Sequence, residues 1–145
     1  MIWPNRSGKG NRPFTLLLSV FLILIGAIAF SACASNAPAT IATVERISPA
    51  AYNQQFGGGE AHTLIDVRTP EEYASGHIEG AVNIPVDSLQ QRLDEVSRDL
   101  PVIVYCRTGN RSAPAAQILV NAGYIQVYDL GGIQSWITAG FPIIQ

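Results

Sequence analysis

A cysteine set between a predicted strand and a predicted helix constrains the fold of this chain more than any other feature. Residues 101–105, a proline followed by β-branched and aromatic side chains, are typical of a buried parallel strand. Cys106 opens a short loop, residues 106–112, and apolar residues then recur at helical spacing over residues 113–120. Ligands of parallel sheets bind outside the carboxyl ends of the strands. The sequence therefore predicts Cys106 at a ligand-binding edge of an α/β fold.

The loop that follows Cys106 favours a bound anion. Its successive backbone N–H groups can converge on one point, and the following helix adds partial positive charge at its N-terminus. Arg107 and Arg111 add full charges. Because all of these groups stabilise a thiolate, we expect the pKa of Cys106 to lie below the free value of about 8.5. The alternative is a small buried cysteine that merely ends a core strand, but such a residue needs no cationic neighbours.

Predicted strands and helices alternate along the rest of the chain. Further strands are expected at residues 44–47 (at a sheet edge), 63–67, 81–84 and 127–130. Ser48 followed by Pro49 predicts the start of one short helix, and Thr69 with Glu72 forms a capping box that predicts another. The alternation indicates an α/β sandwich with a mostly parallel sheet.

Two expectations concern the segments on either side of the Cys106 unit. A helix that begins at Asp87 or Ser88 and ends before Pro101 is predicted from apolar residues on one face, namely Leu89, Leu93, Val96 and Leu100. Gly131 and Gly132 are expected to turn the chain after the last strand. A final short helix then follows, in which Ile133, Trp136 and Ile137 pack.

The N-terminal third resembles an export signal. Residues 1–13 carry three basic residues and no acid, and residues 14–30 are a 17-residue apolar stretch, which is at the short limit for a membrane span. Residues 30–34 resemble the lipobox of bacterial lipoproteins, although Phe30 stands where leucine is usual. We therefore expect lipidation at Cys33, with an uncleaved anchor or a soluble secreted protein as alternatives. Each alternative puts the domain outside the cytoplasm, in the cell envelope or beyond it.

This signal predicts a division into residues 1–33 (signal and lipoprotein segment), 34–43 (tether) and 44–145 (folded domain). The whole chain has a net charge of −2, and the part after Cys33 is more acidic still because residues 1–33 contain no acid. Such a surface excludes a nucleic-acid partner and suits a small anion. No metal is expected, because His62, His77 and the two cysteines lack the spacing of a metal site. If Cys33 is lipidated, Cys106 has no disulfide partner, which indicates a reactive thiol.

Four segments in this order resemble the rhodanese domain family: residues 65–73, 76–85, 106–112, and 130–142 with their Leu-Gly-Gly, Trp136 and Gly-Phe-Pro. The resemblance spans residues 44–143. It implies a three-layer fold with a central, mostly parallel five-stranded sheet and helices on both faces. It also implies a monomeric sulfurtransferase domain that needs no cofactor and moves sulfane sulfur from a donor such as thiosulfate to a thiol or cyanide.

The resemblance also implies roles for individual residues. Cys106 would carry the sulfur as a persulfide. The substrate pocket would be lined by Arg107, Thr108, Gly109, Asn110, Arg111 and Ser112. Asp66 and Arg68 match positions near the site that brace it by polar pairing, with simple capping of a strand end as the alternative.

Two other functions stay open on the sequence. Related thiol-dependent phosphatases use Cys-x5-Arg, whereas here four residues separate Cys106 from Arg111, and Ser112 stands where the phosphatase arginine would be. The shorter loop suits one sulfur atom better than a phosphate group, and no general acid for an alcohol leaving group is evident. A non-catalytic sulfur-carrier or binding module is the other alternative, although the chain keeps the cysteine and both arginines.

Overall fold

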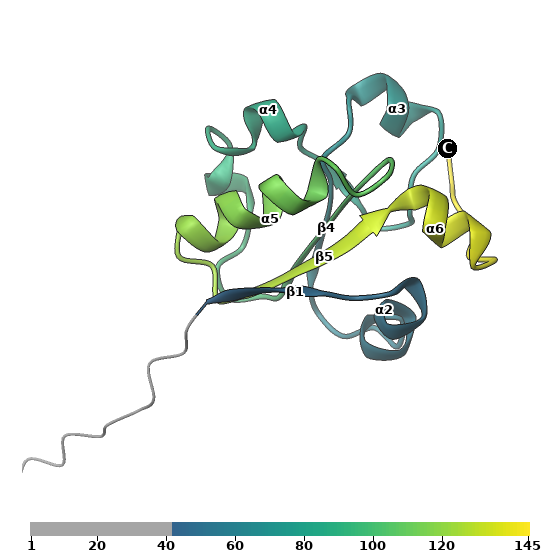
Figure 1. Ribbon diagram of the computed structural model, residues 1–145, viewed down its shortest axis with the longest axis horizontal. Helices are drawn as coiled ribbons and strands as arrows, with labels where there is room; N and C mark the ends of the chain where they lie inside the picture. Colours follow the sequence, from purple (N-terminus) through teal and green to yellow (C-terminus); the bar gives the residue numbers. More distant parts are fainter. Residues whose placement is uncertain (1–41) are drawn as a thin grey trace, which may run out of the picture. The chain divides into compact units, whose positions relative to one another are not determined.

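The sheet of this protein has five strands, all parallel, in the order β1-β5-β4-β2-β3. The structure is a computed structural model that describes residues 42–145 (Figure 1). The strands are β1 (Thr43–Arg46), β2 (Thr63–Asp66), β3 (Val82–Asn83), β4 (Val102–Cys106) and β5 (Gln126–Gly132). The helices are α2 (Pro49–Phe56), α3 (Pro70–Ala74), α4 (Val86–Leu89), α5 (Ser112–Asn121) and α6 (Ile133–Thr138), with a 3-10 turn η1 at Leu93–Glu95.

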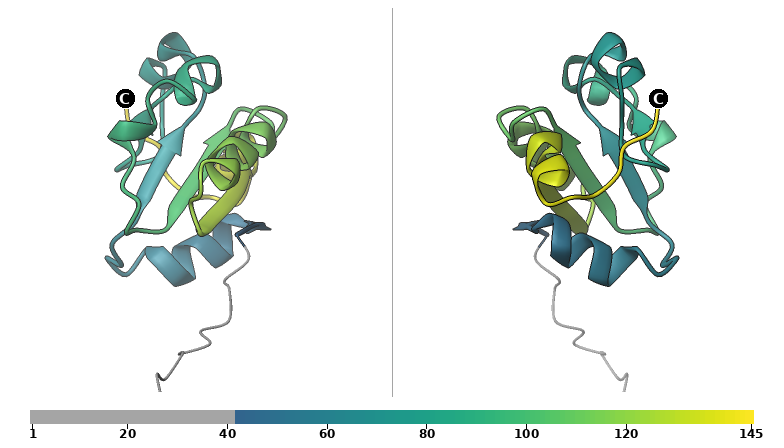
Figure 2. Two further views of the ribbon diagram at one scale, coloured as in Figure 1. Left: turned by 90° about the vertical axis from the view of Figure 1, so that its left-hand side faces the viewer. Right: turned by 90° about the vertical axis from the view of Figure 1, so that its right-hand side faces the viewer.

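Helices cover both faces of the sheet, which confirms the predicted three-layer fold. Figure 1 shows α4 and α5 above the sheet and α2 below it, and Figure 2 shows the same layers from the two ends. One core joins α4 and α5 to the sheet through side chains such as Leu89, Leu119 and Val104. The other joins α2 and α6 to the opposite face through Tyr52, Trp136 and other side chains. Because β4 is the central strand and is buried throughout, its carboxyl end is fixed from both sides.

The local signals for the short helices are confirmed. The Ser48 side chain accepts the N–H of Ala51 at 3.1 Å, and Pro49 is the first residue of α2. In α3, the capping box is complete: Thr69 Oγ1 accepts the N–H of Glu72, and Glu72 Oε2 accepts the N–H of Thr69. The strand predicted at a sheet edge is β1, which begins at Thr43, one residue before the expected boundary.

The prediction of a long helix before Pro101 is wrong. The chain forms only the single turn of α4 and the 3-10 turn η1, and Pro85 rather than Asp87 or Ser88 occupies the N-cap of α4. The Tyr124 hydroxyl donates to the carbonyl oxygens of Leu93 and Val96 at 2.8 and 2.9 Å. This distant side chain binds backbone acceptors that a continuous helix would use for its own hydrogen bonds. Leu89 and Val96 are nevertheless buried, as their spacing predicted.

The prediction of a turn at Gly131-Gly132 is also wrong, because both glycines belong to β5. Gly131 pairs with Tyr105 and Gly132 pairs with Cys106, after a bulge that shifts the register beyond Val104. Gly131 has φ +79°, a conformation that glycine adopts without strain. The last strand therefore runs beside β4 to the level of the cysteine.

Within residues 42–145, no helix has the length and apolar character needed to cross a bilayer. The predicted signal segment, Cys33 and the predicted tether up to residue 41 lie outside the described residues.

Candidate active site

Cys106 is the last residue of β4, and the loop after it folds back over the sulfur atom. The Gly109 N–H donates to Cys106 Sγ at 3.1 Å. Gly109 has φ +104°, so the chain can turn here without the strain that a side chain would cause. Ser112, fully buried, donates its hydroxyl to the carbonyl oxygen of Gly109 at 3.2 Å and so closes the loop at the start of α5. The sequence between the strand and the helix thus forms a tight cradle for one sulfur atom.

Backbone N–H groups set the charge state of this sulfur. Burial alone would raise the pKa of Cys106, but the N–H groups of Arg111, Gly109, Ser112 and Thr108 outweigh it, so the pKa lies below its ordinary value. The loop therefore stabilises a thiolate chiefly through its backbone. An additional anionic sulfur bound to Sγ would meet the same donors.

We expect Cys106 to react as a thiolate at a lower pH than a free cysteine does. The rate of iodoacetamide alkylation should rise with a midpoint below that of a free cysteine, because the lowered pKa keeps the sulfur ionised as the pH falls. Intact mass spectrometry under native and denaturing conditions checks this prediction. In the unfolded chain the midpoint should return to the free value, and equal midpoints in the two states would contradict it.

Arg111 lies beside the sulfur but is already bound by an acid. Its guanidinium donates to Glu72 Oε2 at 2.7 Å and to Glu72 Oε1 at 2.8 Å, which ties the loop to α3. The Arg111 hydrogen bonds lower the pKa of Glu72 to about 2, so this carboxylate stays ionised at every physiological pH. The positive charge that the sequence predicted at this point is thus balanced by a negative charge.

The other predicted loop residues lie further out. Arg107, Thr108 and Asn110 are exposed, whereas Gly109 is buried. Within residues 42–145 the Arg107 side chain forms no hydrogen bond or ion pair, so its charge faces solvent at the rim of the loop. Thr108 acts on the sulfur through its backbone N–H.

Asp66 and Arg68 form a buried ion pair at the carboxyl end of β2. Asp66 is fully buried, and Arg68 donates its Nε to both carboxylate oxygens at 2.9 Å and its backbone N–H to Oδ1 at 2.9 Å. Arg68 also donates to the carbonyl oxygen of Gly76 at 2.7 Å. From β3, the Asn83 side chain binds the carbonyl oxygens of both residues of the pair. The pair therefore fixes the segment from which α3, and with it Glu72, begins.

Two residues that shape the site are not predicted as functional from the sequence. The capping box identified Glu72 only as a helix-starting residue, and its contact with Arg111 joins segments 39 residues apart. Gly132 lies directly against the loop: a Cβ there would come within 2.7 Å of the Arg107 carbonyl oxygen and 2.8 Å of Thr108 Cα. Only glycine fits at this point, because backbone atoms of the loop cannot move aside without disturbing the N–H groups around Cys106.

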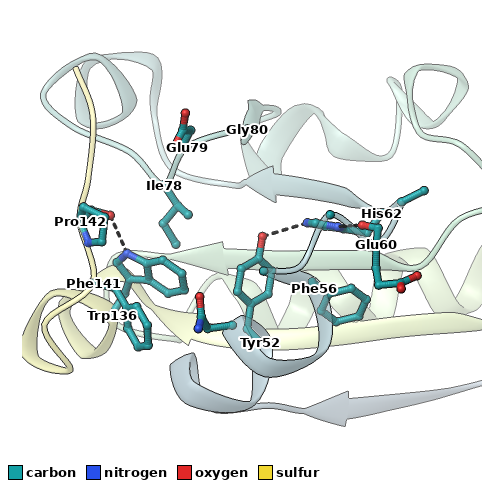
Figure 3. A pocket seen from close by; sticks show the side chains of 14 residues that line it. Tyr52, Phe56, Glu60, His62, Ile78, Glu79, Gly80, Trp136, Phe141 and Pro142 are labelled. Carbon is teal, nitrogen blue, oxygen red and sulfur yellow. Dashed lines mark hydrogen bonds between the residues drawn. The ribbon is translucent and has the colours of Figure 1, made fainter.

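A concavity of about 540 Å³ lies elsewhere and includes no residue of the loop (Figure 3). Its walls come from α2, α6, residues 57–62, residues 78–80 and residues 141–142. In it, His62 binds the Glu60 carbonyl oxygen through Nδ1 at 2.7 Å, which makes Nε2 the acceptor for the Tyr52 hydroxyl at 2.8 Å. Burial raises the pKa of Tyr52 to about 12. The residues that line this groove include no cysteine.

Comparison with known proteins gives consistent matches. The model of the rhodanese-like domain family matches residues 48–139. A sulfurtransferase of Allochromatium vinosum is 37% identical over 102 residues, which cover 70% of this chain and 95% of that protein. The crystal structure of a rhodanese-related protein from Thermoplasma volcanium has a TM-score of 0.62 at 37% identity and covers 69% of this chain and 97% of that one. A structure of rhodanese with anions from E. coli has a TM-score of 0.53 at 36% identity and covers 59% and 99% of the two chains.

Proposed function

Because this chain belongs to the family of rhodanese-like domains, we propose that it is a sulfurtransferase that carries sulfane sulfur on Cys106 as a persulfide. The observation that carries the proposal is the cradle of backbone N–H groups around Cys106 Sγ, with Gly109 N at 3.1 Å. A cradle of this kind stabilises first the attacking thiolate and then the persulfide anion. It supplies the one electrostatic feature that both halves of the reaction need.

The proposed reaction has two displacement steps. The Cys106 thiolate attacks the outer sulfur of a donor such as thiosulfate, a new S–S bond forms, and the donor's S–S bond breaks so that sulfite leaves with the electron pair. A thiolate or cyanide then attacks the outer sulfur of the persulfide, and the Cys106 thiolate is released. Electrons balance within these sulfur compounds, so neither step requires an external oxidant or reductant.

The size of the loop favours this reaction over phosphate ester hydrolysis. Gly109 already donates to Cys106 Sγ, and Ser112, at the position of the phosphatase arginine, is buried with its hydroxyl on Gly109. The loop is therefore closed around a single sulfur atom.

The purified protein, given thiosulfate and cyanide, should release sulfite and thiocyanate in equal amounts. If the protein releases no sulfite and hydrolyses p-nitrophenyl phosphate, the phosphatase alternative is favoured.

The number of turnovers distinguishes the proposed enzyme from a non-catalytic sulfur carrier. A carrier would take up one sulfur atom per chain and release it only to a specific partner, whereas the proposed enzyme turns over repeatedly with small thiols. Multiple turnovers with thiosulfate and a low-molecular-weight thiol would therefore support the enzyme. A single stoichiometric sulfur uptake would favour the carrier.

We also propose that the domain is held at a membrane through lipid on Cys33, in the envelope of a bacterial cell. The basic residues at 1–13, the apolar stretch 14–30 and the small residues before Cys33 support this proposal. The protein should take up labelled fatty acid and partition into detergent, and Cys33→Ser should lose the label yet keep sulfur transfer. Unlabelled protein that stays in membranes would indicate an uncleaved anchor, and soluble protein would indicate secretion.

A further inference from the structure

Arg111, in the loop that follows Cys106, is joined to Glu72, a residue of α3. Two hydrogen bonds, of 2.7 and 2.8 Å, use both terminal nitrogens of the guanidinium and both carboxylate oxygens. The Glu72 side chain is also fixed from behind, because its Oε2 accepts the Thr69 N–H at 3.1 Å in the capping box. About a quarter of the Glu72 side chain and a third of the Arg111 side chain are exposed. The pair is therefore firmly placed and still reachable from solvent.

This pair changes the charge that a substrate meets. Arg46 has a guanidinium nitrogen 3.2 Å from the position of a Gly109 Cβ, but its charge is opposed by Asp129 at 3.5 Å. Arg68 is paired with Asp66. With Arg111 bound to Glu72, Arg107 is the one arginine near the loop that has no acidic partner within residues 42–145. The loop mouth is thus far less cationic than its sequence indicates.

A dianionic donor is poorly matched to this arrangement. Its sulfonate group would approach the guanidinium of Arg111 from beside the Glu72 carboxylate, and the two anions repel each other. To accept hydrogen bonds from Arg111, the sulfonate group would have to displace the two charge-assisted hydrogen bonds between Arg111 and Glu72. A donor of lower charge reaches Cys106 without either cost.

We propose that Glu72 is a specificity-determining residue that, through Arg111, shifts the preference of Cys106 away from dianionic donors and toward donors of lower charge, such as organic persulfides. The proposal rests on the proposed function and specifies its substrate class. With an organic persulfide, the Cys106 thiolate attacks the outer sulfur, a new S–S bond forms, and the organic thiolate leaves with the electron pair of the broken S–S bond. Glu72 touches no reacting atom, so it is a positioning residue.

The test compares Glu72→Gln with Glu71→Gln. Glutamine at the third helical position preserves the capping box, so Glu72→Gln removes the charge without removing the helix start. Glu71 is the adjacent exposed acid, and Glu71→Gln removes the same charge from α3 without touching Arg111. Each variant is assayed with thiosulfate, a dianion, and with methanethiosulfonate, a monoanion that transfers sulfur by the same displacement.

We expect Glu72→Gln to raise the ratio of kcat/KM for thiosulfate to that for methanethiosulfonate about five- to tenfold, because Arg111 becomes free to bind the second charge. Glu71→Gln should change the ratio less than about twofold. A purely structural role of Glu72 would lower both constants together and leave the ratio unchanged. An unchanged ratio, or an equal change in both variants, overturns the proposal while leaving sulfur transfer itself established.

A second measurement does not depend on sulfur transfer. Iodoacetate and iodoacetamide alkylate the same thiolate and differ by one negative charge, so their rate ratio at Cys106 reports the charge at the loop mouth. Glu72→Gln should raise the iodoacetate-to-iodoacetamide ratio several-fold, and Glu71→Gln should not. If this ratio shifts in a protein that transfers no sulfur, the proposed function fails, and only the effect of Glu72 on the charge beside Cys106 stands. If it does not shift, the role of Glu72 fails.

Discussion

Replacing Cys106 by serine should abolish sulfur transfer and leave the domain folded. A serine hydroxyl fits the space of the thiol, which is almost fully buried, and can accept the same N–H groups, including that of Gly109. It cannot form a persulfide, because an oxygen–sulfur adduct has no stable place in the proposed cycle. The unfolding free energy should therefore change little, by about 1 kcal/mol, while turnover falls to the uncatalysed rate.

Intact mass after thiosulfate treatment checks this result directly. The wild-type protein should gain one sulfur atom, and Cys106→Ser should gain none. Cys33→Ser is the matched control, because it leaves Cys106 as the single cysteine of the chain and should still gain one sulfur atom. A sulfur adduct or residual turnover in Cys106→Ser would overturn the persulfide mechanism. Circular dichroism of the variant separates loss of chemistry from loss of fold.

Features encoded by neighbouring residues could be predicted from the sequence. The apolar run before Cys106, the helix start at Ser48 and the capping box of Thr69 and Glu72 each depend on side chains within a few positions of one another. The same holds for the strand–loop–helix unit, whose backbone geometry follows from a central strand, Gly109 and a helix start. Together these signals determined the layers of the fold and the location of the thiol.

Features that depend on distant partners could not be predicted in this way. The apolar spacing of Leu89 and Val96 correctly indicated burial, but the Tyr124 hydroxyl binds the carbonyl oxygens of Leu93 and Val96 and replaces the expected helix with short turns. Two consecutive glycines are typical of a turn, yet Gly132 pairs with Cys106, because β5 continues beyond its bulge. In both places tertiary contacts override local preference.

The electrostatics of the site show the same limit. Two arginines in a short loop predicted a strongly cationic cradle, because their partners cannot be seen in the neighbouring sequence. In the structure, Arg111 is bound to Glu72 from another element and Arg107 faces solvent. The backbone N–H groups remain as the main source of thiolate stabilisation. The charge of the loop residues alone is therefore a poor guide to the donor.

The second large effect expected is on stability. Asp66→Ala should lower the free energy of unfolding by about 3–5 kcal/mol, because within residues 42–145 it leaves the buried Arg68 guanidinium with only the Gly76 carbonyl oxygen as a hydrogen-bond acceptor. Small domains have a total stability of about 5–15 kcal/mol, so this loss is a large share of the whole. Chemical denaturation of the wild type and the variant measures the difference. Glu95→Ala is the matched control, since it breaks the exposed pair with Arg92 and should cost less than about 1 kcal/mol.

A double variant shows whether the cost arises from the unpaired charge. Removing both charges with Asp66→Leu and Arg68→Met replaces the ion pair by apolar side chains, so much of the stability lost in Asp66→Ala should return. The double variant should still transfer sulfur less well than the wild type, because Arg68 no longer holds the Gly76 carbonyl oxygen and the segment that carries Glu72 is less well fixed. If the double variant is no more stable than Asp66→Ala, the cost lies in the geometry of the strand end, and simple capping by Asp66 is the better account of the pair.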